Sequence, residues 1–283
     1  MILAWLVEPF SYPFMQRGLV VALIVGILCA VIGCYVVLRS MAFLGDALAH
    51  AILPGVAVAY LVGGNLLVGA LAAAIVVALG IAFISRGGII KEDTAIGILF
   101  AAALSLGVAL ISSIRTYAVD LSHILFGNIL GVSPSDMLIV IVLSLIVLAL
   151  LVIFYRPFMI VSFDPILAQT LRLPGGLLRS ILLILLAVTI VISMQTVGIG
   201  LVAALLVTPG AAAYLLVRRL PAMMLLSAFF GALSSLVGLY ASFYLNIASG
   251  AAIVLAATII FLLAFFFAPQ RGLLARKNIR SYS

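Results

Sequence analysis

The chain is a succession of long apolar runs separated by short polar connections. An α-helix needs about 20 apolar residues to cross the hydrocarbon core of a bilayer, and nine runs meet that requirement. We therefore predict an all-α polytopic membrane protein, with about nine transmembrane helices (range 8–10) in one bundle and a single transmembrane domain over 1–283. The predicted spans are 17–38, 41–62, 66–85, 94–114, 137–155, 178–195, 198–217, 222–245 and 250–268.

The composition excludes a water-soluble globular protein. Charged residues make up 7% of the chain and hydrophobic residues 67%, whereas soluble domains carry roughly 25% charged residues. The net charge of +7 does not indicate a nucleic-acid partner, because the basic residues lie in the connections and near the C-terminus. Basic residues in those places are orientation signals, and membrane lipid is the partner that the composition predicts.

Lysine and arginine in the connections predict which way the bundle faces. With nine spans, all of the 14 basic residues fall on one side except Arg17 and Arg115. The positive-inside rule places that side in the cytoplasm, together with the basic C-terminal tail, 269–283. The first segment, 1–16, is interrupted by prolines and rich in aromatic residues, so we expect it to lie in the membrane interface.

The second predicted span contains the residues of the main functional hypothesis. In MAFLGDALAHAILPGVAVAYLV (41–62), Asp46 and His50 are four residues apart and would project from one helix face, about 6 Å from each other. With a rise of about 1.5 Å per residue, His50 falls near the bilayer midplane and Asp46 one turn nearer the cytoplasm. Ionisable residues at such depth are costly, which makes them functional candidates.

Three interpretations of this pair are open. It could be a structural hydrogen-bonded pair that locks two helices, a contact for a divalent cation, or a proton relay, since histidine titrates near neutral pH. The two cysteines, Cys29 and Cys34, lie on different faces of the first span and form no CxxC motif. We expect them to pack as small residues and not to bind metal or form a disulfide.

Two prolines are predicted to disturb their spans. Pro54 donates no N–H to the carbonyl of His50 and should kink the second span there, which leaves that carbonyl free for water or a cation. Gly55 allows further bending. Pro209 should kink the span over 198–217 in the same way, with a role in architecture or in gating.

Polar residues also mark the starts of several helices. The segments 92–94 (Glu-Asp-Thr) and 133–136 (Ser-Pro-Ser-Asp) each offer a cap and an early acid to the span that follows. In the longest cytoplasmic connection, 162–176, Asp164 and the proline after it predict an N-cap and a first turn, and Leu-Pro-Gly-Gly ends the element. This short helix is either a plain connector or a docking element, with apolar residues available to pack: Ile166, Leu167 and Leu171.

The connection on the opposite, outer side contains a second acid–histidine pair. Asp120 and His123 are three residues apart. They could form an outer metal contact or an exposed surface pair with no ligand.

Catalytic motifs are missing from the sequence. It contains no GxxxxGK[ST], HExxH or GxSxG motif and no zinc-finger spacing. Without a phosphate-binding loop the chain cannot hydrolyse ATP itself, so we predict no enzymatic activity, no catalytic residue and no permanently bound cofactor. An intramembrane hydrolase using His50 or His123 with a serine lacks a second catalytic pair.

Six segments resemble the membrane permease subunit of ABC importers for zinc, manganese or iron, the ABC-3 or metal-type permeases. The most specific is LRSMAFLGDALAHAILPG (38–55), where the family usually has serine before the histidine and this chain has Ala49. The resemblance covers nearly the whole chain, and its other segments are 92–108, 120–136, 162–174, 195–216 and 248–255.

This resemblance implies a bacterial plasma-membrane protein that pairs with a second permease copy, as a homodimer or a closely similar pair. Two cytoplasmic ATPase subunits would dock below, and an extracytoplasmic solute-binding protein would deliver the ion. The resemblance implies that Asp46 and His50 line the translocation path and that 164–173 is the coupling helix.

The resemblance also bears on the transported ion. Two copies would bring two carboxylates and two imidazoles to one axis, a ligand set that suits Mn²⁺, Zn²⁺ or Fe²⁺ as substrate and, without a thiolate, disfavours Cu(I). The alternative that stays open is a stand-alone proton-coupled secondary cation transporter that uses Asp46 and His50 as a relay.

Overall fold

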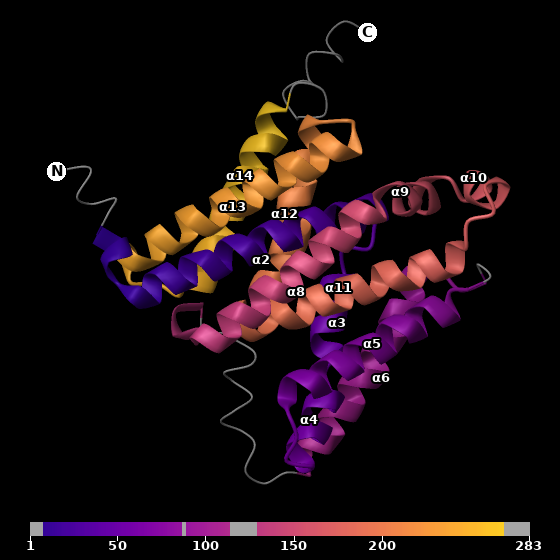
Figure 1. The fold of residues 1–283 in the computed structure, drawn as a ribbon, viewed down its shortest axis with the longest axis horizontal. Helices are drawn as coiled ribbons and strands as arrows, with labels where there is room; N and C mark the ends of the chain where they lie inside the picture. The colour runs from indigo at the N-terminus through magenta and orange to yellow at the C-terminus, as the bar shows by residue number, and fades with distance from the viewer. Residues whose placement is uncertain (1–7, 87–88, 114–128, 269–283) are drawn as a thin grey trace, which may run out of the picture.

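Helices form all the regular structure in the computed structural model, which describes residues 8–86, 89–113 and 129–268. Figure 1 shows their arrangement. In chain order they are η1 (Glu8–Ser11), α2 (Pro13–Leu38), α3 (Leu44–Ala51), α4 (Leu53–Leu61), α5 (Leu66–Ile84), α6 (Glu92–Ser112), η2 (Ile129–Gly131), α8 (Pro134–Ile153), α9 (Tyr155–Phe163), α10 (Pro165–Thr170), α11 (Gly175–Val197), α12 (Ile199–Leu216), α13 (Leu220–Leu245) and α14 (Ser249–Phe267).

Within these described ranges, each of the nine predicted spans corresponds to an apolar helical segment. Eight segments are long and apolar enough to cross a bilayer, with α3 and α4 together counting as one, and α12 is a shorter apolar helix. The predicted all-α polytopic fold is therefore confirmed. Helix ends differ from the predicted spans by up to four residues, with the largest shift at α2, which already begins at Pro13. In addition, α9 is a separate helix that the apolar pattern did not reveal.

The helix α2 is the centre of the bundle. It contacts α8, α11, α12 and α13, and buried residues occur on all its sides. On one side of α2, α12, α13 and α14 pack together, whereas α4, α5 and α6 form a second group, seen in the lower part of Figure 1. The short helix α3 contacts α12, α11, α5 and α6, so it lies where the two groups meet.

The outer helices expose large apolar side chains. Phe83 on α5, Val152 on α8, Leu225 on α13 and Phe267 on α14 are among the most exposed. Soluble monomers rarely expose apolar patches of more than a few hundred Å². In this chain such faces suit contact with lipid.

Glycines allow two pairs of helices to approach closely. A Cβ atom added to Gly55 would overlap the carbonyl of Gly69, and one added to Gly69 would overlap the carbonyl of Gly55, so α4 and α5 touch backbone to backbone. The same reciprocal contact joins Gly26 of α2 to Gly231 of α13. Small residues at such crossings are the usual means of packing helices in lipid.

The predicted helix caps are confirmed at one of the two membrane helices for which they were expected. At the start of α8, the hydroxyl of Ser133 accepts a hydrogen bond from the backbone N–H of Asp136 at 3.2 Å. At the start of α6 the predicted acids are present in the first turn, as Glu92 and Asp93, but the predicted cap is not observed. The N-cap residue is Lys91, whose side chain makes no capping bond, and the first helical residue, Glu92, reaches toward other helices instead.

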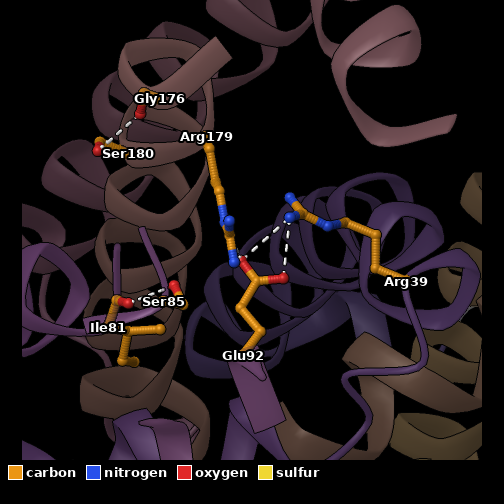
Figure 2. A network of polar contacts seen from close by, with 7 residues as sticks. All are labelled: Arg39, Ile81, Ser85, Glu92, Gly176, Arg179 and Ser180. Carbon is orange, nitrogen blue, oxygen red and sulfur yellow. Dashed lines mark hydrogen bonds and ion pairs between the residues drawn. The ribbon is translucent and has the colours of Figure 1, made fainter. Parts of the chain in front are cut away.

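Glu92 is the centre of a three-residue ionic cluster, which we call the Arg39–Glu92–Arg179 cluster and which Figure 2 shows. Arg39 Nη2 donates to Glu92 Oε1 at 3.0 Å and to Oε2 at 2.9 Å, and Arg179 Nε donates to Oε1 at 2.6 Å. The Glu92 side chain is 14% exposed and that of Arg39 12%. Burial lowers the pKa of Arg39, while the adjacent Glu92 carboxylate acts in the opposite direction.

Candidate metal site

The predicted interruption of the second span is confirmed. The helix stops after Ala51, and Ile52 joins α3 to α4, which has Pro54 in its first turn. The backbone N–H of Ile52 lies beside the His50 carbonyl, and contact of that carbonyl with water or a cation stays a prediction. The break arises because proline has no N–H and crowds the preceding turn.

Asp46 and His50 lie on the same face of α3, as their spacing predicted. Asp46 Oδ1 and His50 Nε2 are 3.6 Å apart, too far for a hydrogen bond but close enough for an ion pair if the imidazole is protonated. Asp46 is in the first turn of α3 and His50 in the last turn, so each polar group stands at the end where the helix dipole favours its charge.

The face of α3 that carries this pair is left partly open by the described residues. The opposite face is buried, and it includes Leu48 and Gly45, which packs against Leu206 of α12. The side chain of His50 is 30% exposed and that of Asp46 43% exposed. Within one chain the pair is therefore half covered and faces away from its own core.

Two aromatic residues that the sequence did not single out lie beside the Asp46–His50 pair. The ring of Phe100, on α6, meets the His50 imidazole edge to face with centroids 6.1 Å apart. Phe100 also packs edge to face on Phe43, just before α3, with centroids 5.5 Å apart. These contacts fix the direction of the imidazole. A phenylalanine in an apolar run carries no signal in the sequence that sets it apart from lipid-facing neighbours.

The two residues next to the break have packing roles. Pro54 contacts α6 where Gly107 leaves room for it, since a Cβ atom there would lie 3.1 Å from Pro54 Cδ. Gly55 forms the close contact with α5 described above. The sequence had suggested only that this glycine would allow extra bending. Pro209 is buried within α12, which continues through it from Ile199 to Leu216. A gating role for Pro54, Gly55 or Pro209 stays a prediction.

A second element with predicted function is the helix α10. Asp164 Oδ1 accepts the backbone N–H of Leu167 at 2.9 Å, which confirms the predicted N-cap and first-turn proline. The helix ends at Thr170, and the turn that follows it contains Arg172, whose φ of 52° is left-handed. Ile166 is 77% exposed, and Leu167 and Leu171 are exposed as well, so the described residues leave these three apolar side chains largely uncovered, whereas Ala168 is buried.

The other residues considered as ligands are either outside the described residues or buried elsewhere. Asp120 and His123 lie outside the described residues, as does the tail 269–283. Cys29 and Cys34 are buried and free, which confirms that they form no disulfide. Among the described residues, no group of three or more His, Cys, Asp or Glu side chains is placed to hold a metal ion. Within the described residues, Asp46 and His50 are therefore the candidate metal ligands.

Comparison with known proteins shows where this arrangement belongs. Residues 11–268 match the family described as "ABC 3 transport family". The manganese transport system membrane protein MntC of Halalkalibacterium halodurans is 48% identical over 266 residues, which are 94% of this chain and 91% of that protein. A probable iron transport system membrane protein of Haemophilus influenzae is 40% identical over 267 residues, covering 94% of this chain and 98% of that protein.

A solved structure is similar along the whole chain. It is PsaBC from Streptococcus pneumoniae in complex with Fab, with a TM-score of 0.85 and 40% identity, and the match covers 98% of this chain and 100% of that one. Family match, sequence identity and fold therefore agree, and this chain belongs to the ABC 3 transport family.

Proposed function

We propose that this chain is the permease subunit of an ABC importer that moves a divalent metal cation into the cell, with Mn²⁺ as the first candidate. Family membership supports the transporter class. The metal is supported by the printed names of its relatives, of which one is a manganese and another a probable iron transport protein. Zn²⁺ and Fe²⁺ suit the same oxygen and nitrogen ligands.

The observation that carries this proposal is the half-covered Asp46–His50 pair. Two metal–ligand bonds of about 2.1 Å span at most about 4.2 Å, so one ion can contact both Asp46 Oδ1 and His50 Nε2, which are 3.6 Å apart. An acidic group at the centre of a span costs roughly 2.5–3.5 kcal/mol if it faces lipid. The open face of α3 must therefore meet water or protein.

A second copy of the chain, packed against the exposed face of α3, would cover the Asp46–His50 pair. Two copies placed with α3 toward a common axis would supply two carboxylates and two imidazoles. Such a site forms only between chains, and it would bind the ion loosely enough for release, as conduction requires. In this arrangement Asp46 and His50 are the translocation ligands, and the metal is a substrate and not a cofactor.

The distribution of basic residues indicates which end of the bundle faces the cytoplasm. The connections after α2, α5, α8 and α12 carry seven of the 14 basic residues and the C-terminal tail carries four more, which supports a cytoplasmic location for these parts of the chain in a bacterial cell. The exposed apolar residues of α10 are then a docking surface for a cytoplasmic ATPase subunit: Ile166, Leu167 and Leu171, held by the Asp164 cap. A solute-binding protein would deliver the ion at the opposite end.

The proposal is tested by removing each ligand with little change of volume. Asp46→Asn and His50→Gln should each lower the manganese content of cells that depend on this transporter by about tenfold or more, because even indirect partners of metal ligands are worth about 10–100-fold in affinity. The matched control is Thr258→Val, which alters an intramembrane polar residue on α14. Normal manganese content in both ligand variants would contradict the assigned roles, and measuring zinc and iron in the same cells identifies the metal.

A further inference from the structure

None of the functional roles proposed so far involves the Arg39–Glu92–Arg179 cluster. We propose that Glu92 is a positioning residue that links the docking helix α10 to the metal-ligand helix α3, so that ATP hydrolysis is coupled to transport through this carboxylate. This inference rests on the proposed function. Its evidence is the position of the three residues at the ends of three different helices, together with their burial.

Each residue of the cluster lies near the end of a helix that leads to, or contacts, an element with a proposed function. Arg39 ends α2 and is followed by the turn that leads into α3, only seven positions before Asp46. Arg179 lies near the start of α11, which follows α10 after a short connection. Glu92 is the first residue of α6, the helix that places Phe100 against the His50 ring. Besides the direct contact of α11 with α3, a displacement of α10 therefore has a route to α3 through this carboxylate.

The hydrogen bonds of the cluster are shared and incomplete. Glu92 Oε1 accepts from both guanidinium groups, whereas Oε2 accepts from Arg39 alone. Arg39 Nη1 is buried and has no hydrogen-bond partner in the described part of the chain. Two arginines thus share one carboxylate as hydrogen-bond acceptor. A shift of α11 relative to α2 would change which of its oxygen atoms each guanidinium group contacts.

Stability alone does not account for such a cluster. Apolar residues of similar volume often hold helices together as well as a buried ion pair or better, whereas buried ionic groups serve best to select one arrangement over another. Removing one partner leaves the other charges uncompensated. A transporter alternates between two arrangements of its helices, and an ionic cluster of this kind can favour one arrangement over the other.

The test uses the whole transporter, with its ATPase subunits and binding protein, in proteoliposomes. We measure the number of Mn²⁺ ions taken up per ATP hydrolysed for the wild type and for Glu92→Gln, which keeps the shape of the side chain and removes its charge. The ratio should fall about tenfold, within the range of coupling between linked sites, while Mn²⁺ binding by the complex is kept. The matched control is Asp93→Asn, an exposed acid at the next position of the same helix.

The outcomes separate this inference from the proposed function. Absence of Mn²⁺ uptake by the wild type would contradict the proposed function, whereas normal uptake with an equal ratio in Glu92→Gln and Asp93→Asn overturns the inference alone. Uptake and ATP hydrolysis that fall together, in step with a loss of folded protein, would reduce the cluster to a structural role. If Glu92→Gln does not assemble, Arg179→Lys, which keeps the charge and loses the Nε donor, is judged by the same ratio.

Discussion

Polar side chains inside this apolar bundle fall into two kinds, which differ in how they are satisfied. Glu92 accepts three hydrogen bonds from two guanidinium groups and is nearly enclosed. Asp46 and His50 have only each other within the described residues, at 3.6 Å, and are open on one side. The Glu92 carboxylate finds its partners within the described part of one chain, whereas the described residues leave one side of the Asp46–His50 pair uncovered. This contrast is why we assign the metal to α3 and the coupling role to Glu92.

The turn between α2 and α3 gives a test at a single residue. Ser40 has a φ of 58° at the end of α2, and its N–H bonds to Val37 O at 3.1 Å while that of Met41 bonds to Val36 O at 3.0 Å, which is a Schellman motif. A left-handed conformation costs a residue with a Cβ atom roughly 1–2 kcal/mol, and glycine avoids that cost but gains freedom in the unfolded chain.

Ser40→Gly should therefore raise the stability of the purified protein by about 0.5–1 kcal/mol. Thermal unfolding in detergent measures the change. The control is Ser40→Ala, which retains the Cβ atom and should give no gain. A lower unfolding temperature for Ser40→Gly than for Ser40→Ala contradicts this interpretation of the turn.

The sequence was informative at residues whose partners are near in the chain. The Asp46–His50 pair follows from helical spacing, and the Asp164 cap lies three residues from the N–H that it accepts. Glu92 was expected to act locally, yet its partners are 53 and 87 residues away. No local pattern contains that information. The contact of Phe100 with His50 is hidden for the same reason.

Among the elements, the long apolar helices were predictable and the short ones only in part. The run over 41–62 was expected to bend at Pro54, and it divides into α3 and α4. The helix α9 was missed because its residues, YRPFMIVSF, continue the apolar run of α8 and show no start signal beyond a proline. Its separate direction is fixed by packing, since it contacts α11 as well as α8 and α10.

The docking role of α10 is tested by placing a charge on its exposed apolar surface. Ile166→Asp should weaken binding of the isolated ATPase subunit to the permease by about 30-fold, as expected for a hot-spot residue worth about 2 kcal/mol. Titration of the labelled ATPase subunit against the purified permease measures the affinity. The control is Ile89→Asp, which changes a residue that is 95% exposed in a different connection. Equal affinity for both variants would reduce α10 to a plain connector.

At the scale of the whole molecule, the bundle has three kinds of surface. Apolar faces on α5, α8, α13 and α14 suit lipid, the end with α10 suits a cytoplasmic partner, and the open face of α3 suits a second copy. None of these surfaces carries an ATP-binding motif. Under the proposed function, the molecule is one part of an assembly in which the energy source and half of the metal ligands come from other chains.

The most direct test of this account is uptake of Mn²⁺ into proteoliposomes that hold either the purified chain alone or the chain with its ATPase subunits and binding protein. We predict uptake only in the complete assembly and only with ATP, and loss of that uptake in Asp46→Asn. Robust Mn²⁺ flux through the chain alone, driven by a pH gradient, would contradict the account and support a proton-coupled carrier that uses Asp46 and His50 as its relay.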